Sequence, residues 1–202
     1  MTEQAEQQAF WERLHLPPPG AAMPLAAYDA LPETTIPMEY IHGRVVYPHW
    51  NETSMTPTPR PRHQLVVGEV YTVLRGLIPD GRLLLSPMDV AIGGQKVQPD
   101  VFWASAGGNC TRGEAHYVGA PDLAVEVLSP GNASHDRITK FDLYEQHGVR
   151  EYWLLDPEED VIEVYMLADG AFQRSGAYTV GDTFRSPLLQ QTVTVSDLFD
   201  ID

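Results

Sequence analysis

Two acidic residues in the middle of the chain interrupt apolar runs that are typical of buried strands. Asp100 lies in the run VQPDVFW, and Glu126 lies in PDLAVEVLSPG. Burying a carboxylate without a partner is costly, so a site that buries both must supply a cation, a proton or hydrogen-bond donors. Lys140 follows on a segment predicted to be helical. Two strand carboxylates and a lysine are a minimal set for metal-assisted hydrolysis.

The spacing of this set favours a magnesium or manganese site. The loop between the two predicted strands lets them lie side by side, which would bring Asp100 and Glu126 to one end of a sheet. Mg²⁺ prefers oxygen ligands and keeps several waters, so the backbone carbonyl of Val127 and waters would complete its shell. The ion would polarise a phosphoryl oxygen and lower the pKa of a bound water. The ammonium of Lys140 would orient that water or stabilise the developing negative charge.

A purely structural interpretation stands beside this one. Asp100 would then cap a turn after Pro99, Glu126 would pair with an arginine, and Lys140 would be solvated. Tyr144, four residues after Lys140 on the same predicted helix stripe as Asp136, would pack against the sheet.

Hydrophobic periodicity predicts a mixed sheet with helices on its faces. Strands before and after a crossover helix indicate this α/β (α+β) arrangement. Segments 48–62 and 104–120 are rich in Pro, Gly or polar residues and are predicted to be loops. The predicted helices are 2–16, 24–31, 63–78 and 134–147, with a short one at the end of the chain. The predicted strands are 38–41, 44–47, 82–85, 89–92, 98–103, 123–128, 151–155, 161–167, 178–184 and 192–195.

Composition narrows the function classes. The chain has 202 residues, a net charge of −15 and one cysteine, Cys110. It has no apolar run long enough to span a membrane and no secretory signal, and one cysteine suits a reducing compartment, so we expect a cytoplasmic protein. The negative charge disfavours non-specific nucleic-acid binding, because phosphate contacts need local cations. Four cations could form a local basic rim, or could be scattered solvated charges: Arg60, Arg62, Lys96 and Arg137.

Several other chemistries lack their motifs. Cys110 and His116 have no second Cys/His pair for a zinc site. Ser129 lacks the G-x-S-x-G context of a serine hydrolase, and the chain has no phosphate-binding glycine loop.

Longer strings in the chain carry a family resemblance. PDVFW at 99–103, AVEVLSP at 124–130 and DRITKFDLYEQHGVREYWLLDP at 136–157 resemble the Uma-type restriction endonuclease family of the PD-(D/E)XK nuclease superfamily. MEYIHGRVVY at 38–47 and the His63-Gln64 helix start also fit. The resemblance covers about residues 24–200.

The resemblance implies a restriction-endonuclease-like core with a divalent-metal site. Carried over, Asp100 and Glu126 would bind the metal and Lys140 would serve catalysis. Glu39 and His63 would be supporting site residues. From their local sequence alone, Glu39 is more simply a surface acid in a hairpin, and His63 a polar residue at a helix start.

The chain departs from the plain superfamily pattern at one position. Leu128 stands two residues after Glu126, where the E-x-K motif has lysine. The resemblance instead places the lysine on the following helix, as Lys140, whose ammonium must reach back to the carboxylates.

Together these observations predict a Mg²⁺- or Mn²⁺-dependent endonuclease that hydrolyses DNA phosphodiester bonds. Residues 1–23 would form a helical extension and residues 24–202 the nuclease domain. A homodimer would suit cleavage of both strands, with Phe10, Trp11 and Leu14 offering a contact. Two alternatives remain: a catalytically silent binding or regulatory module of the same fold, and a metal-dependent hydrolase of small phosphate esters.

Overall fold

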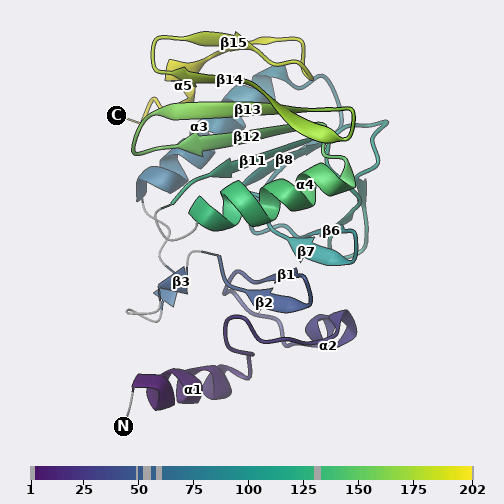
Figure 1. Cartoon of the computed structure of the whole chain (residues 1–202), viewed down its shortest axis with the longest axis vertical. Coiled ribbons are helices and arrows are strands. Elements are labelled where there is room, and N and C mark those ends of the chain that lie inside the picture. Colours follow the sequence, from purple (N-terminus) through teal and green to yellow (C-terminus); the bar gives the residue numbers. More distant parts are fainter. Residues whose placement is uncertain (1–2, 49, 52–55, 58–60, 130–132, 202) are drawn as a thin grey trace.

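Two six-stranded sheets form the body of the molecule in a computed structural model of the chain (Figure 1). The structure describes residues 3–48, 50–51, 56–57, 61–129 and 133–201. None of the helices in these ranges is long and apolar enough to cross a membrane.

The sheet with the longer strands, which contains β11 and β12, is mixed, as predicted. β11 and β12 run parallel, and every other neighbouring pair is antiparallel. The helical segment between β11 and β12 is the crossover that a parallel pair requires. The strand order is β14 (Ala171–Thr179), β13 (Val161–Ala168), β12 (Glu151–Asp156), β11 (Leu123–Val127), β8 (Val101–Ala104) and β5 (Arg82–Leu85).

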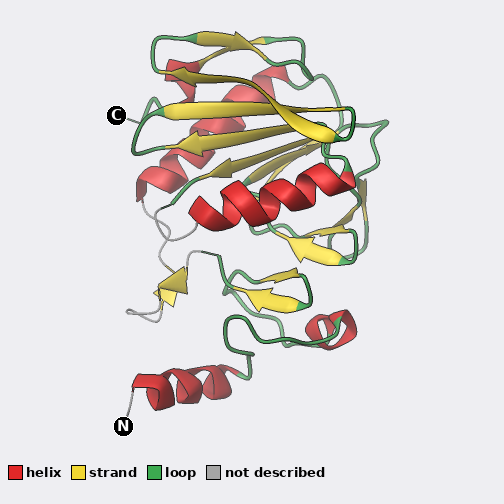
Figure 2. Cartoon of the chain, viewed as in Figure 1, coloured by secondary structure: helices red, strands yellow, loops and turns green. Residues whose placement is uncertain are grey.

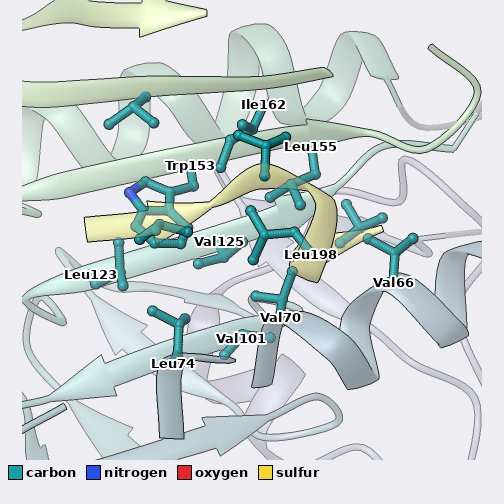
Figure 3. Close-up of a cluster of buried hydrophobic side chains, with 14 of the residues drawn as sticks. Val66, Val70, Leu74, Val101, Leu123, Val125, Trp153, Leu155, Ile162 and Leu198 are labelled. Atoms are coloured by element: carbon teal, nitrogen blue, oxygen red, sulfur yellow. The ribbon is translucent and has the colours of Figure 1, made fainter. Parts of the chain in front are cut away.

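Helices cover both faces of this sheet, which explains why its central strands are apolar on both sides. Every residue of β8 and β11 is buried. On one face α3 (Pro61–Leu77) places Val66, Val70 and Leu74 against the sheet, and α5 (Val195–Leu198) adds Leu198 (Figure 3). On the other face α4 (Phe141–His147) crosses the strands (Figures 1 and 2).

The second sheet carries an N-terminal hairpin toward the face covered by α4. β1 pairs with β7, with Tyr40 opposite Lys96, so the start of β1 lies beside the chain entering β8. This pairing gives Glu39, on β1, access to residues about sixty positions later. The strand order is β2 (Arg44–Val46), β1 (Glu39–Ile41), β7 (Gln95–Val97), β6 (Val90–Ile92), β10 (Tyr117–Val118) and β9 (Thr111–Arg112).

The N-terminal extension packs on this hairpin. α1 (Glu3–Leu14) buries Trp11 against Tyr47, with ring centroids 4.5 Å apart. α2 (Leu25–Asp29) buries Tyr28, whose hydroxyl donates a hydrogen bond to the carbonyl of Met38. Trp11, which we expected to be available for a dimer contact, is therefore buried in a contact within its own chain. The homodimer stays a prediction.

Four expectations about elements need correction. The segment 178–184 is not one strand. It contains the end of β14, then a turn, and then the start of a separate strand, β15 (Thr183–Arg185), which pairs with β16 (Thr192–Thr194). The predicted loop 104–120 contains β9 and β10, and 48–62 contains the short pair β3 (Trp50–Asn51) and β4 (Thr56–Pro57). The predicted strand 98–103 begins only at Val101, after β7 has ended at Val97.

The helix predicted over 134–147 has two parts. Its first part, η1 (His135–Lys140), is a π-helix in which the N–H of Phe141 bonds to the carbonyl of Asp136. α4 follows and ends at His147. Gly148 terminates it, as predicted, with a φ of 86°, a left-handed conformation that glycine adopts without strain.

Candidate functional site

The ammonium of Lys140 lies at the centre of a buried group of carboxylates. Its Nζ is 3.0 Å from Glu126 Oε2, 3.1 Å from Glu39 Oε1 and 3.5 Å from Asp136 Oδ1. All four side chains are at most 2% exposed. A solvated Lys140 and an arginine partner for Glu126, the structural interpretation of the sequence, are therefore wrong. The lysine on the helix does reach back to the strand carboxylate.

Glu39 is fully buried, which corrects its interpretation as a surface acid of the hairpin. Its Oε1 accepts a hydrogen bond from the backbone N–H of Gln98 at 2.8 Å, and its Oε2 lies 2.9 Å from Nε2 of His135. Burial alone would raise the pKa of this carboxyl. Lys140, His135 and the Gln98 N–H together outweigh burial and hold the pKa at about 2. Glu39 is thus an anion that fixes the position of Lys140.

The π-helix explains how His135 and Lys140 both reach Glu39. In an α-helix, residues five apart point about 140° away from each other. The wider i→i+5 turn brings such residues toward one face, and such turns are frequent at functional sites. His135 and Lys140, five residues apart, accordingly contact opposite oxygens of the same carboxylate.

The strands that position Asp100 and Glu126 are neighbours, as predicted, although Asp100 itself lies just before its strand. β8, which follows Asp100 directly, runs antiparallel to β11, which carries Glu126, and Val101 pairs with Val125. Asp100 Oδ2 accepts the N–H of Val127 at 2.8 Å and lies 3.2 Å from Nε2 of His63. Burial disfavours a charged His63, but the contact with Asp100 outweighs it and raises the pKa of the imidazole. His63 does lie in the first turn of α3, as its local sequence predicts, and it is buried against Asp100.

Glu126 is held from two sides. Lys140 contacts Oε2, and the hydroxyl of Tyr144 donates to Oε1 at 2.8 Å. Burial raises the pKa of Glu126 well above its ordinary value, and Lys140 opposes that rise only in part. Burial likewise raises the pKa of Asp136 to about 6, again against the influence of Lys140.

The number and type of charged side chains in the site bear on whether it suits a divalent metal. Three buried carboxylates contact Lys140, and a fourth, that of Asp100, is buried in the same region, so the site holds more carboxylates than ammonium groups. Within the described ranges, Asp136 Oδ1 has no hydrogen-bond donor, although it is buried. Carboxylate oxygens are the donors that Mg²⁺ and Mn²⁺ prefer. The same ranges contain no three Asp, Glu, His or Cys side chains already gathered around one ion position. The donors therefore fit such an ion in type, and two carboxylates with the Val127 carbonyl and waters remain the expected shell.

The structure brings all five expected site residues into one buried region and adds three. Glu39, His63, Asp100, Glu126 and Lys140 are each at most 5% exposed. The sequence did not single out His135 or Asp136 as site residues, and it favoured packing for Tyr144. Tyr144 does pack in the core, but its hydroxyl also holds Glu126. The i, i+4 spacing of Asp136, Lys140 and Tyr144 was the signal that could have found two of the three.

The basic rim considered from the sequence is largely neutralised. Lys96 pairs with Asp29 at 2.7 Å, and Arg62 pairs with Asp160 at 2.6 Å. Arg137 pairs with Glu163 on β13. Arg60 lies outside the described residues.

A mixed sheet between helices, with buried carboxylates and a lysine at its end, defines a nuclease-like α/β protein. The chain belongs to the Uma2 family, described as "Putative restriction endonuclease", whose model matches residues 25–196. It is also similar in fold to the crystal structure of a "putative nuclease belonging to DUF820" from Anabaena variabilis. That similarity has a TM-score of 0.71 at 22% identity and covers 88% of this chain and 98% of the other. A comparison with curated proteins found no match.

Proposed function

We propose that this protein is a Mg²⁺- or Mn²⁺-dependent endonuclease that hydrolyses DNA phosphodiester bonds. One observation carries the proposal: Asp100 directly precedes β8, the neighbour of the strand β11 that carries Glu126, and Lys140 reaches Glu126 from the crossover helix. The family is described as "Putative restriction endonuclease" and the similar Anabaena variabilis protein as a "putative nuclease", which supports the same class of activity.

The chain's own residues would divide the work. Asp100, Glu126 and the carbonyl of Val127 would hold the metal, which supplies Lewis-acid stabilisation and an acidified water when bound. Lys140 would stabilise negative charge that develops on the phosphate. Glu39 and His63 act as positioning residues, because Glu39 fixes Lys140 and His63 lies against Asp100.

The test compares two aspartates that are equally buried. Purified protein is incubated with linear, supercoiled and single-stranded DNA in Mg²⁺ and in Mn²⁺. We expect cleavage, and we expect Asp100→Asn to abolish it. Asp122→Asn is the matched control, since both aspartates are 5% exposed but Asp122 binds Arg150 and the Ser105 N–H instead. Thermal melting establishes that both variants fold.

Cleavage by Asp100→Asn at the rate of the unmodified protein would reject the metal-site assignment. An equal loss in Asp122→Asn would show that the effect comes from the fold rather than from the site. Absence of cleavage of every DNA form in both metals would reject the activity itself.

A second candidate is a nuclease-fold module without catalysis. It is favoured by one observation, the lack of a ready three-ligand cluster within the described residues. Calorimetric titration with Mn²⁺ separates the two candidates. The nuclease requires binding that Glu126→Gln weakens, whereas the silent module requires no site at Glu126.

A further inference from the structure

A cleft of about 320 Å³ opens beside the buried carboxylates. The hairpin of β1 and β2 forms one wall, with Ile41, Arg44 and Val46 among its lining residues. His135 and Thr139 of η1 also line the cleft. Pro19 and Gly20 close one side, so the N-terminal extension contributes to the cleft as well.

His135 links this cleft to the site. Its side chain is 14% exposed and lines the cleft, while its Nε2 lies 2.9 Å from Glu39 Oε2. The other oxygen of Glu39 contacts Lys140. A molecule in the cleft would therefore meet His135 one carboxylate away from the lysine that holds Glu126.

The cleft is cationic in a strongly acidic protein. Arg44 carries the positive charge, and none of the described residues that line the cleft is acidic. Among the described residues, Arg44 forms no ion pair; its guanidinium donates a hydrogen bond to the carbonyl of Gly20. This sets Arg44 apart from Lys96, Arg62 and Arg137, whose charges are already paired with carboxylates.

We propose that this cleft is a subsite for single-stranded DNA, in which Arg44 binds a backbone phosphate and His135 contacts the strand beside the carboxylates. The proposal rests on the nuclease function proposed above and specifies the form of its substrate. A cleft of this volume is near the lower limit for small ligands, so it suits a nucleotide unit and not the width of a duplex. Sequence-tolerant binding of single strands needs a local cationic groove. A duplex tract needs a longer run of phosphate contacts, which a protein of net charge −15 disfavours.

The proposal also changes what is expected of assembly. Cleavage of both strands of a duplex favours two active sites, whereas cleavage of a single strand needs only one active site. Single-strand binding therefore requires no dimer.

The test measures DNA binding without chemistry. The full chain is titrated, in EDTA, into a fluorescein-labelled strand of about 12 nucleotides and into the corresponding blunt duplex, with anisotropy as the readout. We expect the single strand to bind at least about tenfold more tightly. Repeating the titration over a range of salt gives the slope of log K against log[salt]. Loss of one phosphate contact should reduce that slope by about 0.7 for a single strand.

Four variants locate the contact. Arg44→Gln should weaken single-strand binding and reduce the salt slope, while Arg44→Lys keeps the charge and should keep the slope. Arg112→Gln should change neither, because Arg112 is also exposed but lies on β9, at the opposite edge of the same sheet. Thr139→Trp should block the cleft and lose binding. Melting temperatures establish that each variant folds, which matters for Arg44 because its bond to Gly20 is also removed.

Each other result overturns the subsite: equal or tighter binding of the duplex, an unchanged slope in Arg44→Gln, retained binding in Thr139→Trp, or no binding of either DNA. These failures are separate from failure of the nuclease function. DNA cleavage with no effect of Arg44→Gln on binding would leave the nuclease and remove the subsite. If the protein bound single strands through Arg44 but cleaved no DNA, the subsite would stand and the nuclease function would be rejected.

Discussion

Nζ of Lys140 lies 3.0 Å from Oε2 of Glu126, and both side chains are buried. Lys140 also contacts Glu39, which belongs to the other six-stranded sheet, so one ammonium joins carboxylates of two sheets. The lysine therefore contributes to the fold as well as to the proposed chemistry. Its two contributions have different experimental signatures.

The chain's two lysines should differ sharply in their effect on stability. Lys140→Met leaves three buried carboxylates without their cation, so we expect the free energy of unfolding to fall by about 3–5 kcal/mol. Lys96→Met removes a pair whose partner, Asp29, is 44% exposed, and should cost less than about 1 kcal/mol. Urea denaturation measures both. Equal losses would contradict a special role of Lys140 in the fold.

The hydroxyl of Tyr144 should matter through Glu126. Tyr144→Phe removes one of the two groups that hold this carboxylate, so we expect a loss of about 1–3 kcal/mol in stability and weaker Mn²⁺ binding. Tyr178→Phe is the comparison, because Tyr178 stacks on Phe184 away from the site. Calorimetric titration measures the Mn²⁺ affinity. If Tyr144→Phe bound Mn²⁺ as tightly as the unmodified chain, the role of the hydroxyl in metal binding would be rejected.

Metal binding should release protons. Burial raises the pKa of Asp136 to about 6 and that of Glu126 well above its ordinary value, so both carboxyls retain protons at mildly acidic pH. A divalent ion binds the deprotonated forms. Mn²⁺ affinity should therefore rise from about pH 5 to about pH 8, and the measured heat should depend on the ionisation enthalpy of the buffer. An affinity that does not change over this interval would show that the ion binds elsewhere.

A buried glutamate outside the site should give the fold a separate dependence on pH. Burial raises the pKa of Glu151, and hydrogen bonds from Trp153, Leu188 and Ser186 offset the rise only in part. The folded chain therefore holds this proton at pH values where the unfolded chain has lost it. Its contribution to stability is full below the ordinary pKa of 4.5 and declines as pH rises through the folded pKa.

Glu151→Gln removes this titration and should flatten the fall in melting temperature above about pH 4.5. The variant should also be less stable throughout, by about 1–3 kcal/mol, because an amide cannot accept all three hydrogen bonds. Thermal melting across pH measures both effects. A pH profile parallel to that of the unmodified chain would remove Glu151 as the cause.

Local sequence determined the elements whose burial is continuous or periodic. The apolar runs around Asp100 and Glu126 marked central strands, because strands covered on both faces lose their polar alternation. The periodic apolar residues of α3 and the stop at Gly148 were likewise visible. β14 was missed over most of its length, since it is an exposed edge strand without an apolar signal and is held by its pairing with β13.

By itself, the sequence placed two carboxylates in strands and a lysine on the following helix. Only the tertiary structure decided that Glu39 is buried rather than exposed, because its environment comes from β7, Gln98 and η1, far along the chain. It also decided that a π-helical turn aligns His135 with Lys140, since the apolar pattern predicted a helix over 134–147 without distinguishing an i→i+4 turn from an i→i+5 turn. Side-chain charge and strand propensity are local properties, whereas burial and mutual distance depend on which distant segments pair.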